Sequence, residues 1–233
     1  MPDSRDLRLV WDLPVRICHW LLVLAVAGSW LTHKLGPQAF AWHVWCGYTT
    51  LVLIFFRVVW GFVGPRHARF ASFLRGPAAT LKYSGSLFGL TAMQRHAGHN
   101  PLGALMVVLF LVLLGAQGAT GLFANDEIMS AGPLYGYVSD ETSDALSDWH
   151  RELTNVLWVA IGLHVGAVLL YWIVKRQNLV GPMFSGRKPG ELLQPGDEIA
   201  GSRVWLALVI AGTGAALLYA IVATAPEPSL LLF

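Results

Sequence analysis

Four histidines of this chain lie inside, or at the start of, long apolar stretches of sequence: His19, His43, His150 and His164. An ionisable side chain in such a stretch is costly to bury, and it usually faces a bundle interior where it serves a function. A neutral imidazole nitrogen ligates transition metals and haem iron, and it also forms hydrogen bonds or carries protons. Each of the four is therefore a candidate functional residue.

The spacing of His150 and His164 places both imidazoles on one face of a single helix. Fourteen residues at about 100° each make about 1400°, some 40° short of four turns, and their rise of about 1.5 Å per residue separates them by about 21 Å. One helix would thus present two ligands, one near each side of a membrane. Arg57 follows His43 by the same interval, so it shares that face at a deeper level.

Five apolar stretches are long enough to carry these residues across a bilayer, for which about 20 residues suffice. They are expected to be helices, because lipid leaves backbone groups no other partner. Hydrophobic residues make up 55% of the 233 residues and charged residues only 13%, which excludes a water-soluble globule. The expected spans are residues 13–32, 39–63, 101–123, 148–174 and 204–225.

The expected fold is an all-α integral membrane protein, with a four-helix transmembrane bundle that carries the four histidines and a fifth C-terminal transmembrane helix. The bundle is expected within residues 1–187, and residues 188–233 add a cytoplasmic loop and the fifth helix. Ser139 precedes two acidic residues and is typical of a helix N-cap, so the fourth helix is expected to begin near Asp140, before the membrane.

The charges predict how the chain is oriented. Thirteen of the 16 Lys and Arg residues lie before or at the start of the first span, after the second or after the fourth. Because cytoplasmic loops carry the excess of Lys and Arg, the N-terminus is expected in the cytoplasm and the C-terminus on the outer side of the membrane. Residues 66–100 are expected to lie on the membrane surface as an amphipathic stretch, and residues 181–201 to form a plain loop.

This orientation pairs the histidines by depth: His43 with His150 near the outer side, and His19 with His164 near the inner side. Two such pairs suit two b-type haems, each with imidazoles at both axial positions. Iron without an open position carries electrons rather than binding oxygen. Arg57, near the inner pair, would hold a haem propionate through charge-assisted hydrogen bonds.

Other interpretations stay open at this point. A lone histidine in a span often serves only as a hydrogen-bond partner between helices. A transition-metal or proton site would be expected to bring carboxylates or thiols, which the spans almost lack. Arg57 could instead extend to the cytoplasmic interface, and His99 competes for the inner ligand position. His33 and His67, beside span ends, are expected to be solvated.

Three motifs resemble the bacterial cytochrome b561 family, which includes the b-type cytochrome subunit of nickel–iron hydrogenases. They are WDLPVRICHWLLVLAVAGSWLT from Trp11, RVVWGFVGPRHARFASF from Arg57 and GHNPLGALM from Gly98. The resemblance covers about residues 7–187. It implies a four-helix core with two haems b, whose ligands come from the first, second and fourth helices and correspond to His19, His43, His150 and His164. It also implies electron exchange with the quinone pool and with a redox partner protein.

The expected function is electron transfer between the quinone pool and an extracytoplasmic protein, either a c-type cytochrome or a hydrogenase-like subunit. His99 and Asn100 mark the expected quinone region. Nucleic acid is not expected as a partner, a homodimer is compatible with the sequence, and whether the chain is an enzyme in its own right stays open. Two alternatives are a self-contained haem oxidoreductase, which passes electrons from superoxide or another small donor to quinone, and a non-redox membrane anchor.

Overall fold

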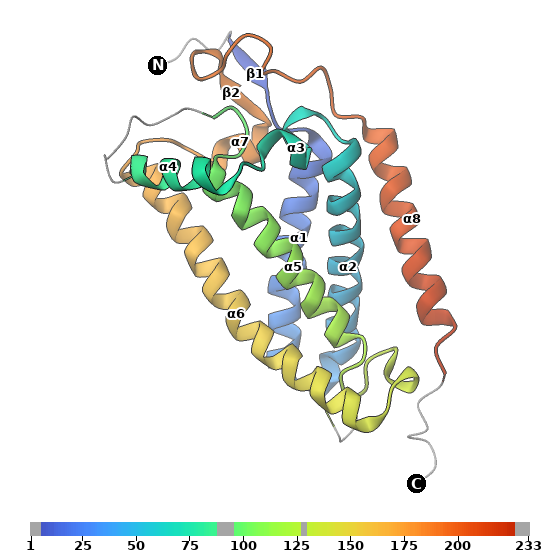
Figure 1. Ribbon diagram of the computed structural model, residues 1–233. Helices are drawn as coiled ribbons and strands as arrows, with labels where there is room; N and C mark the ends of the chain where they lie inside the picture. The colour runs from blue at the N-terminus through green and yellow to red at the C-terminus, as the bar shows by residue number, and fades with distance from the viewer. Residues whose placement is uncertain (1–5, 88–95, 127–129, 227–233) are drawn as a thin grey trace. The chain divides into compact units, whose positions relative to one another are not determined.

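The computed structural model describes residues 6–87, 96–126 and 130–226 (Figure 1). Within these ranges, five helices are long and apolar enough to cross a membrane, so the chain is an all-α, multi-pass integral membrane protein. They are α1 (Leu13–Leu35), α2 (Phe40–Val63), α5 (Pro101–Gly121), α6 (Asp140–Ile173) and α8 (Val204–Ala223).

The five helices confirm the five expected spans. Apart from the start of α6, their ends differ from the expected ends by at most three residues. As predicted, α6 begins at Asp140, where the hydroxyl of Ser139 accepts a hydrogen bond from the Thr142 N–H at 3.3 Å. A 3₁₀ turn, Pro37–Ala39, joins α1 to α2.

Shorter elements connect the spans. Helices α3 (Phe70–Phe73) and α4 (Pro77–Leu87) fall within the stretch that was expected to lie on the membrane surface. The remainder of that stretch includes residues 88–95, which lie outside the described residues. Helix α7 (Val180–Ser185) and strand β2 (Arg187–Pro189) follow α6, and strand β1 (Leu7–Leu9) precedes α1.

Strands β1 and β2 form a small antiparallel sheet in which Arg8 lies opposite Lys188. The N–H groups of Val10 and Trp11 continue this contact, because both donate to the carbonyl oxygen of Gly186, at 2.9 and 3.0 Å. The prediction of a plain loop over residues 181–201 is therefore wrong where α7 and β2 form. Such short strands are stabilised by hydrogen bonds to the backbone of the partner strand. Backbone hydrogen bonds do not depend on side-chain type, so they leave no periodic pattern in the sequence.

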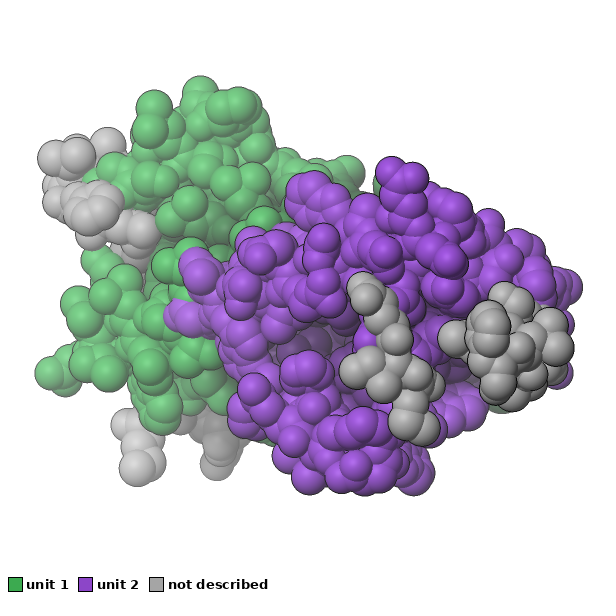
Figure 2. Space-filling model, turned by 90° about the horizontal axis from the view of Figure 1, so that it is seen from below, with its two compact units in different colours: residues 1–18, 57–109, 163–207 green, residues 19–56, 110–162, 208–233 purple. Residues whose placement is uncertain are grey.

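The chain divides into two compact units, each built from segments that are distant in sequence (Figure 2). The first unit comprises residues 1–18, 57–109 and 163–207, and it contains the sheet with α3, α4 and α7. The second unit comprises residues 19–56, 110–162 and 208–233. Each long helix contributes residues to both units.

An apolar core within the second unit joins its segments of α1, α2, α5 and α6. Its buried residues are Ile54, Leu113, Leu114, Leu157 and Ala160, and Leu22, Val26 and Leu153 are among those packed against them. Burial of large aliphatic side chains at this density fixes the helices relative to one another inside the unit. The unit therefore offers a rigid frame for polar side chains on its helices.

Candidate functional site

The second unit brings together two of the four histidines, His43 of α2 and His150 of α6. Their ring centroids are 6.2 Å apart, and the ring planes are inclined at 76°. Both side chains are only partly exposed. The depth argument paired these two residues, and the structure places them next to each other.

Backbone carbonyls fix the tautomer of both rings. His43 Nδ1 lies 2.9 Å from the carbonyl oxygen of Ser29, and His150 Nδ1 lies 2.9 Å from that of Gln117. A carbonyl oxygen can only accept, so Nδ1 carries the proton in both rings and Nε2 keeps its lone pair. Metal-ligating histidines are commonly oriented through such a hydrogen bond from the other ring nitrogen.

The separation of the two rings fits a metal ion between them. A metal–imidazole bond of about 2.0 Å, with each ring nitrogen about 1.2 Å from its centroid, puts two opposed ring centroids about 6.4 Å apart. The observed value is 6.2 Å. Among the described residues no group of three or more His, Cys, Asp or Glu side chains could hold a metal ion. Two imidazoles are a complete set of axial protein ligands for a haem iron, because the macrocycle supplies the other donors.

His33, near the end of α1, also approaches this pair. Its ring centroid lies 6.5 Å from that of His43, with the ring planes inclined at 56°. His33 is exposed on the protein surface, and its solvation stays a prediction. Its proximity to His43 was not predicted, because it depends on the turn between α1 and α2. The structure therefore offers a third imidazole at this place.

His19 and His164 belong to different units, so their predicted pairing stays a prediction. Both are partly buried. The ring of His19 packs edge-on against Trp20, its neighbour on α1, with centroids 5.0 Å apart.

Arg57 is buried in the first unit, with 6% of its surface exposed. Its Nη1 donates to the carbonyl oxygen of Ala68 at 3.2 Å, and its guanidinium carbon lies 5.4 and 5.8 Å from the ring centroids of Phe70 and Phe73. Nη2 has no hydrogen-bond partner among the described residues. A buried N–H without an acceptor is costly, so this guanidinium suits an additional anionic group such as a haem propionate.

Asp12 is a buried carboxylate near Arg57 that sequence reasoning missed. Only 1% of its surface is exposed, and it accepts hydrogen bonds from Trp60 Nε1 at 3.1 Å and from the Val15 N–H at 3.0 Å. Burial raises the pKa of this carboxyl group, and its hydrogen bonds and the charge of Arg57 oppose that rise. The position of Asp12 just before the first apolar stretch could have indicated that it caps α1, because aspartate is a preferred N-cap residue.

The two residues of the expected quinone region are engaged in packing and capping. The His99 ring lies against Trp11 and Phe73, with centroids 4.6 and 4.7 Å away. Asn100 caps α5, because its Oδ1 accepts from the Gly103 N–H at 2.7 Å. Its amide nitrogen donates to the Tyr171 hydroxyl at 3.2 Å. Polar and aromatic groups from α5 and α6 thus meet at this end of the first unit.

Lys188 is a buried cation beside this region. Its ammonium donates to the carbonyl oxygen of Ala97 at 2.6 Å and lies 5.8 Å from a Trp11 ring centroid. Burial lowers the pKa of this lysine to about 8. Sequence reasoning missed it, because its burial depends on the β1–β2 pairing.

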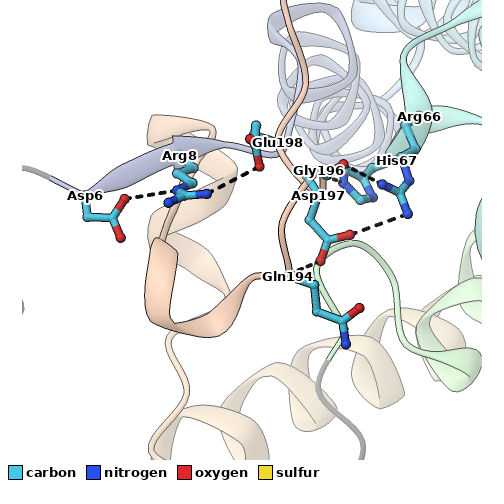
Figure 3. A network of polar contacts seen from close by, with 8 residues as sticks. All are labelled: Asp6, Arg8, Arg66, His67, Gln194, Gly196, Asp197 and Glu198. Atoms are coloured by element: carbon cyan, nitrogen blue, oxygen red, sulfur yellow. Dashed lines mark hydrogen bonds and ion pairs between the residues drawn. The ribbon is translucent and has the colours of Figure 1, made fainter.

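The prediction that His67 is solvated is wrong. His67 is buried, its Nε2 donates to the carbonyl oxygen of Asp197 at 2.6 Å, and burial lowers its pKa (Figure 3). The same aspartate forms an ion pair with Arg66 at 3.5 Å. Contacts with the segment after β2 therefore cover a histidine that hydropathy alone places at an exposed helix end.

Acidic side chains gather in the second unit near His150. A hollow there is lined by Asn125, Asp126, Asp144, Ser147, Asp148 and Arg151. Arg151 forms an ion pair with Asp148, one helical turn away. Asp126 precedes α6, whereas Asp144 and Asp148 lie on its first turns, so the acidic groups come from both the loop and the helix.

Comparison with known proteins gives a consistent result. The model of a family described as prokaryotic cytochrome b561 matches residues 10–186. A probable Ni/Fe-hydrogenase B-type cytochrome subunit of Azotobacter chroococcum is 28% identical over 76% of this chain and 86% of its own length. That of Rhodobacter capsulatus is 26% identical over 77% and 80%. A probable superoxide oxidase CybB of Yersinia pestis is 28% identical over 69% and 87%. No solved structure matches.

Proposed function

The chain belongs to the prokaryotic cytochrome b561 family, and on that premise we propose that it carries two b-type haems and moves electrons between the quinone pool and an extracytoplasmic protein. Membership makes it a membrane b-type cytochrome that transfers electrons. The number of haems, their ligands, the quinone and the partner are the proposed parts. Each rests on an observation of its own.

The outer haem site is the part with the most direct support. His43 and His150 would be its axial ligands, and the ring separation of 6.2 Å is the observation that carries this assignment. Haem bound there would supply an iron that is reversibly oxidised and reduced by one electron. The chain holds both imidazoles with Nδ1 directed toward a carbonyl oxygen, and iron bound at His150 Nε2 would replace the Gln117 amide nitrogen that lies 3.1 Å from it.

The inner haem site would take His19 and His164 as ligands. Support comes from the spacing of fourteen residues between His150 and His164 on α6. Arg57 would bind a propionate of this haem, because its buried Nη2 lacks an acceptor among the described residues. Two haems about 21 Å apart along one helix would form a path across much of the membrane.

Quinone exchange is proposed at the end of the first unit where α5 begins. His99 and Asn100 mark this region, and Tyr171, whose hydroxyl accepts from Asn100, adds a polar group there. Quinone reduction consumes two electrons and two protons. A buried lysine with a pKa of about 8 nearby, Lys188, is compatible with a region that takes up protons from the cytoplasm.

The redox partner is proposed to bind on the periplasmic side, beside the outer haem. Several relatives have names that describe them as probable subunits of a Ni/Fe-hydrogenase, which favours a hydrogenase-like partner. Acidic residues of the second unit, Asp126, Asp144 and Asp148, would steer a basic face of that partner toward His150. The bacterial inner membrane, with a cytoplasmic N-terminus, is the proposed location.

A second candidate function is a self-contained oxidoreductase that passes electrons from superoxide to quinone. The relative named as a probable superoxide oxidase favours it, since it is as similar in identity as the hydrogenase-type relatives. Purified protein that reduces quinone catalytically with superoxide as its only donor would support this candidate. A protein that turns over only with a hydrogenase-like or cytochrome partner would exclude it.

Haem analysis of the purified protein and its histidine variants tests the proposal. A pyridine haemochrome assay should find two haems b per chain, and each of H43A and H150A should retain one. H19A and H164A should each lose the other haem. H33A is the matched control, because His33 lies 6.5 Å from His43 yet is exposed, and it should keep both. Two haems in any of the four ligand variants would contradict that residue's assignment.

A further inference from the structure

Helix α5 supplies none of the proposed ligands, yet it makes the closest contacts with the ring of His150. We infer that Gln117 and Gly121 of α5 are positioning residues, which fix the orientation of the His150 imidazole and thereby tune the outer haem. This inference rests on the proposed role of His150 as an axial ligand. All of the residues involved belong to the second unit.

Gln117 contacts His150 through both its backbone and its side chain. Its carbonyl oxygen accepts from His150 Nδ1 at 2.9 Å. Its amide nitrogen lies 3.1 Å from the His150 carbonyl oxygen and 3.0 Å from Thr154 Oγ1, one turn further along α6. The same amide nitrogen lies 3.2 and 3.1 Å from the two ring nitrogens. One residue of α5 thus holds the ring and the helix turn that carries it.

Gly121 provides the space in which the ring lies. A Cβ atom at this position would be 2.8 Å from His150 Cε1 and 3.1 Å from Nδ1. Carbon atoms in contact are normally about 3.5–4.0 Å apart, so a methyl group at this position would push the imidazole aside. Thr120 completes the contact, with its hydroxyl 3.3 Å from Nδ1.

The orientation of an axial imidazole affects the iron that it binds. A hydrogen bond from Nδ1 raises the basicity of the ligand, and partners beyond the first ligand shell tune redox potential. The angle between the planes of two axial imidazoles also determines the electron paramagnetic resonance signal of low-spin ferric haem, and the rings of His43 and His150 are inclined at 76° here. A forced rotation of His150 should therefore change the signal and the potential of one haem only.

The experiment compares G121A with G115A in the purified, haem-loaded protein. Gly115 lies on the same helix, but a Cβ there would make only an ordinary contact, 3.7 Å from Ile54. We expect G115A to match the wild type. We expect G121A to shift the resonance and midpoint potential of one of the two haems, or to lose that haem, while the other is unchanged. H150A identifies the affected signal as the one that it abolishes.

Q117L keeps the test decisive if G121A does not fold. This variant removes the side-chain amide but leaves the backbone carbonyl that accepts from Nδ1. It should move the signal of the same haem and leave the other in place. Unchanged spectra and potentials in G121A, or in Q117L where G121A yields no protein, would overturn the inference. H150A with two intact haems would instead contradict the proposed function.

Discussion

Arg57 and Lys188 are cations that the first unit buries to 6% and 7% exposure, and the described residues satisfy them only in part. Each donates a hydrogen bond to a backbone carbonyl and lies near an aromatic ring. Burying a charge in this way costs free energy unless an anion compensates it. For Arg57 a haem propionate would be that anion, so loss of its charge should change a haem potential. For Lys188 no haem contact is proposed, so loss of its charge should change the stability of the fold.

Replacing Arg57 should change the potential of the inner haem. A positive charge beside a propionate disfavours the ferric state, which carries one more positive charge than the ferrous state. R57Q should therefore lower one of two midpoint potentials, and R57K should lower it less, in a redox titration monitored by optical absorption. R75Q is the control, since Arg75 is exposed and donates to the nearby Ser72 carbonyl. Unchanged potentials in R57Q would argue against a propionate contact.

Lys188 should make stability depend on pH. Its pKa is lowered by burial from 10.5 to about 8, so between these values the unfolded chain binds more protons than the folded chain. The contribution of Lys188 to the free energy of unfolding is therefore lowest below pH 8 and rises toward pH 10.5. At 1.36 kcal/mol per pKa unit, the whole rise is at most about 3 kcal/mol. K188M should flatten that rise in thermal unfolding measured at pH 7 and at pH 9.5. A slope equal to that of the wild type would contradict the burial of a charged ammonium.

The elements of the fold differ in how far the sequence predicts them. The sequence predicted the five long helices to within a few residues: α1, α2, α5, α6 and α8. A stretch of about twenty apolar residues can be buried in few ways other than as a membrane-spanning helix. The sheet was not predicted. Its strands have three residues each, and pairing between Leu7–Leu9 and Arg187–Pro189 links parts of the chain that no local pattern connects. The burial of His67 and Lys188 was missed for the same reason.

The turn that leads into β2 should be sensitive to a single methyl group. Gly186 has a φ of +77°, and a Cβ there would lie 2.7 Å from the carbonyl oxygen of Trp11. Gly196 has a φ of +84°, but a Cβ there would meet no atom within 4 Å other than those of its chain neighbours. G196A should therefore cost only the strain of a left-handed residue, about 1–2 kcal/mol. G186A should cost more, and hydrogen exchange should show faster exchange at the amides of Val10 and Trp11. Equal losses in both variants would contradict the close approach.

At the scale of the whole molecule, sequence and structure agree on a membrane protein. The four candidate histidines could be selected from the sequence because they are ionisable residues in apolar stretches. The pairing of His43 with His150 followed from depth alone. The contacts that α5 makes with His150 did not, because Gln117 and Gly121 resemble any small or polar residues in a span. The candidate histidines could be predicted because their residue type limits the chemistry, whereas the contacts that orient the His150 ring could not.

The proposed orientation of the chain rests on how its charges are distributed along the sequence, which the net charge of +2 does not show. Five spans would place the two ends on opposite sides of the membrane, and thirteen of 16 Lys and Arg residues would then lie on the side of the N-terminus. Moving those cations across the bilayer would oppose the positive-inside bias. Fusions made after Ala225 should therefore give active alkaline phosphatase and no fluorescent protein signal, and fusions in the loop after α6 should give the reverse. A cytoplasmic reporter at Ala225 would contradict the proposed orientation: the pairs would stay the same, but His43 and His150 would lie beside the cytoplasm and His19 and His164 beside the periplasmic partner.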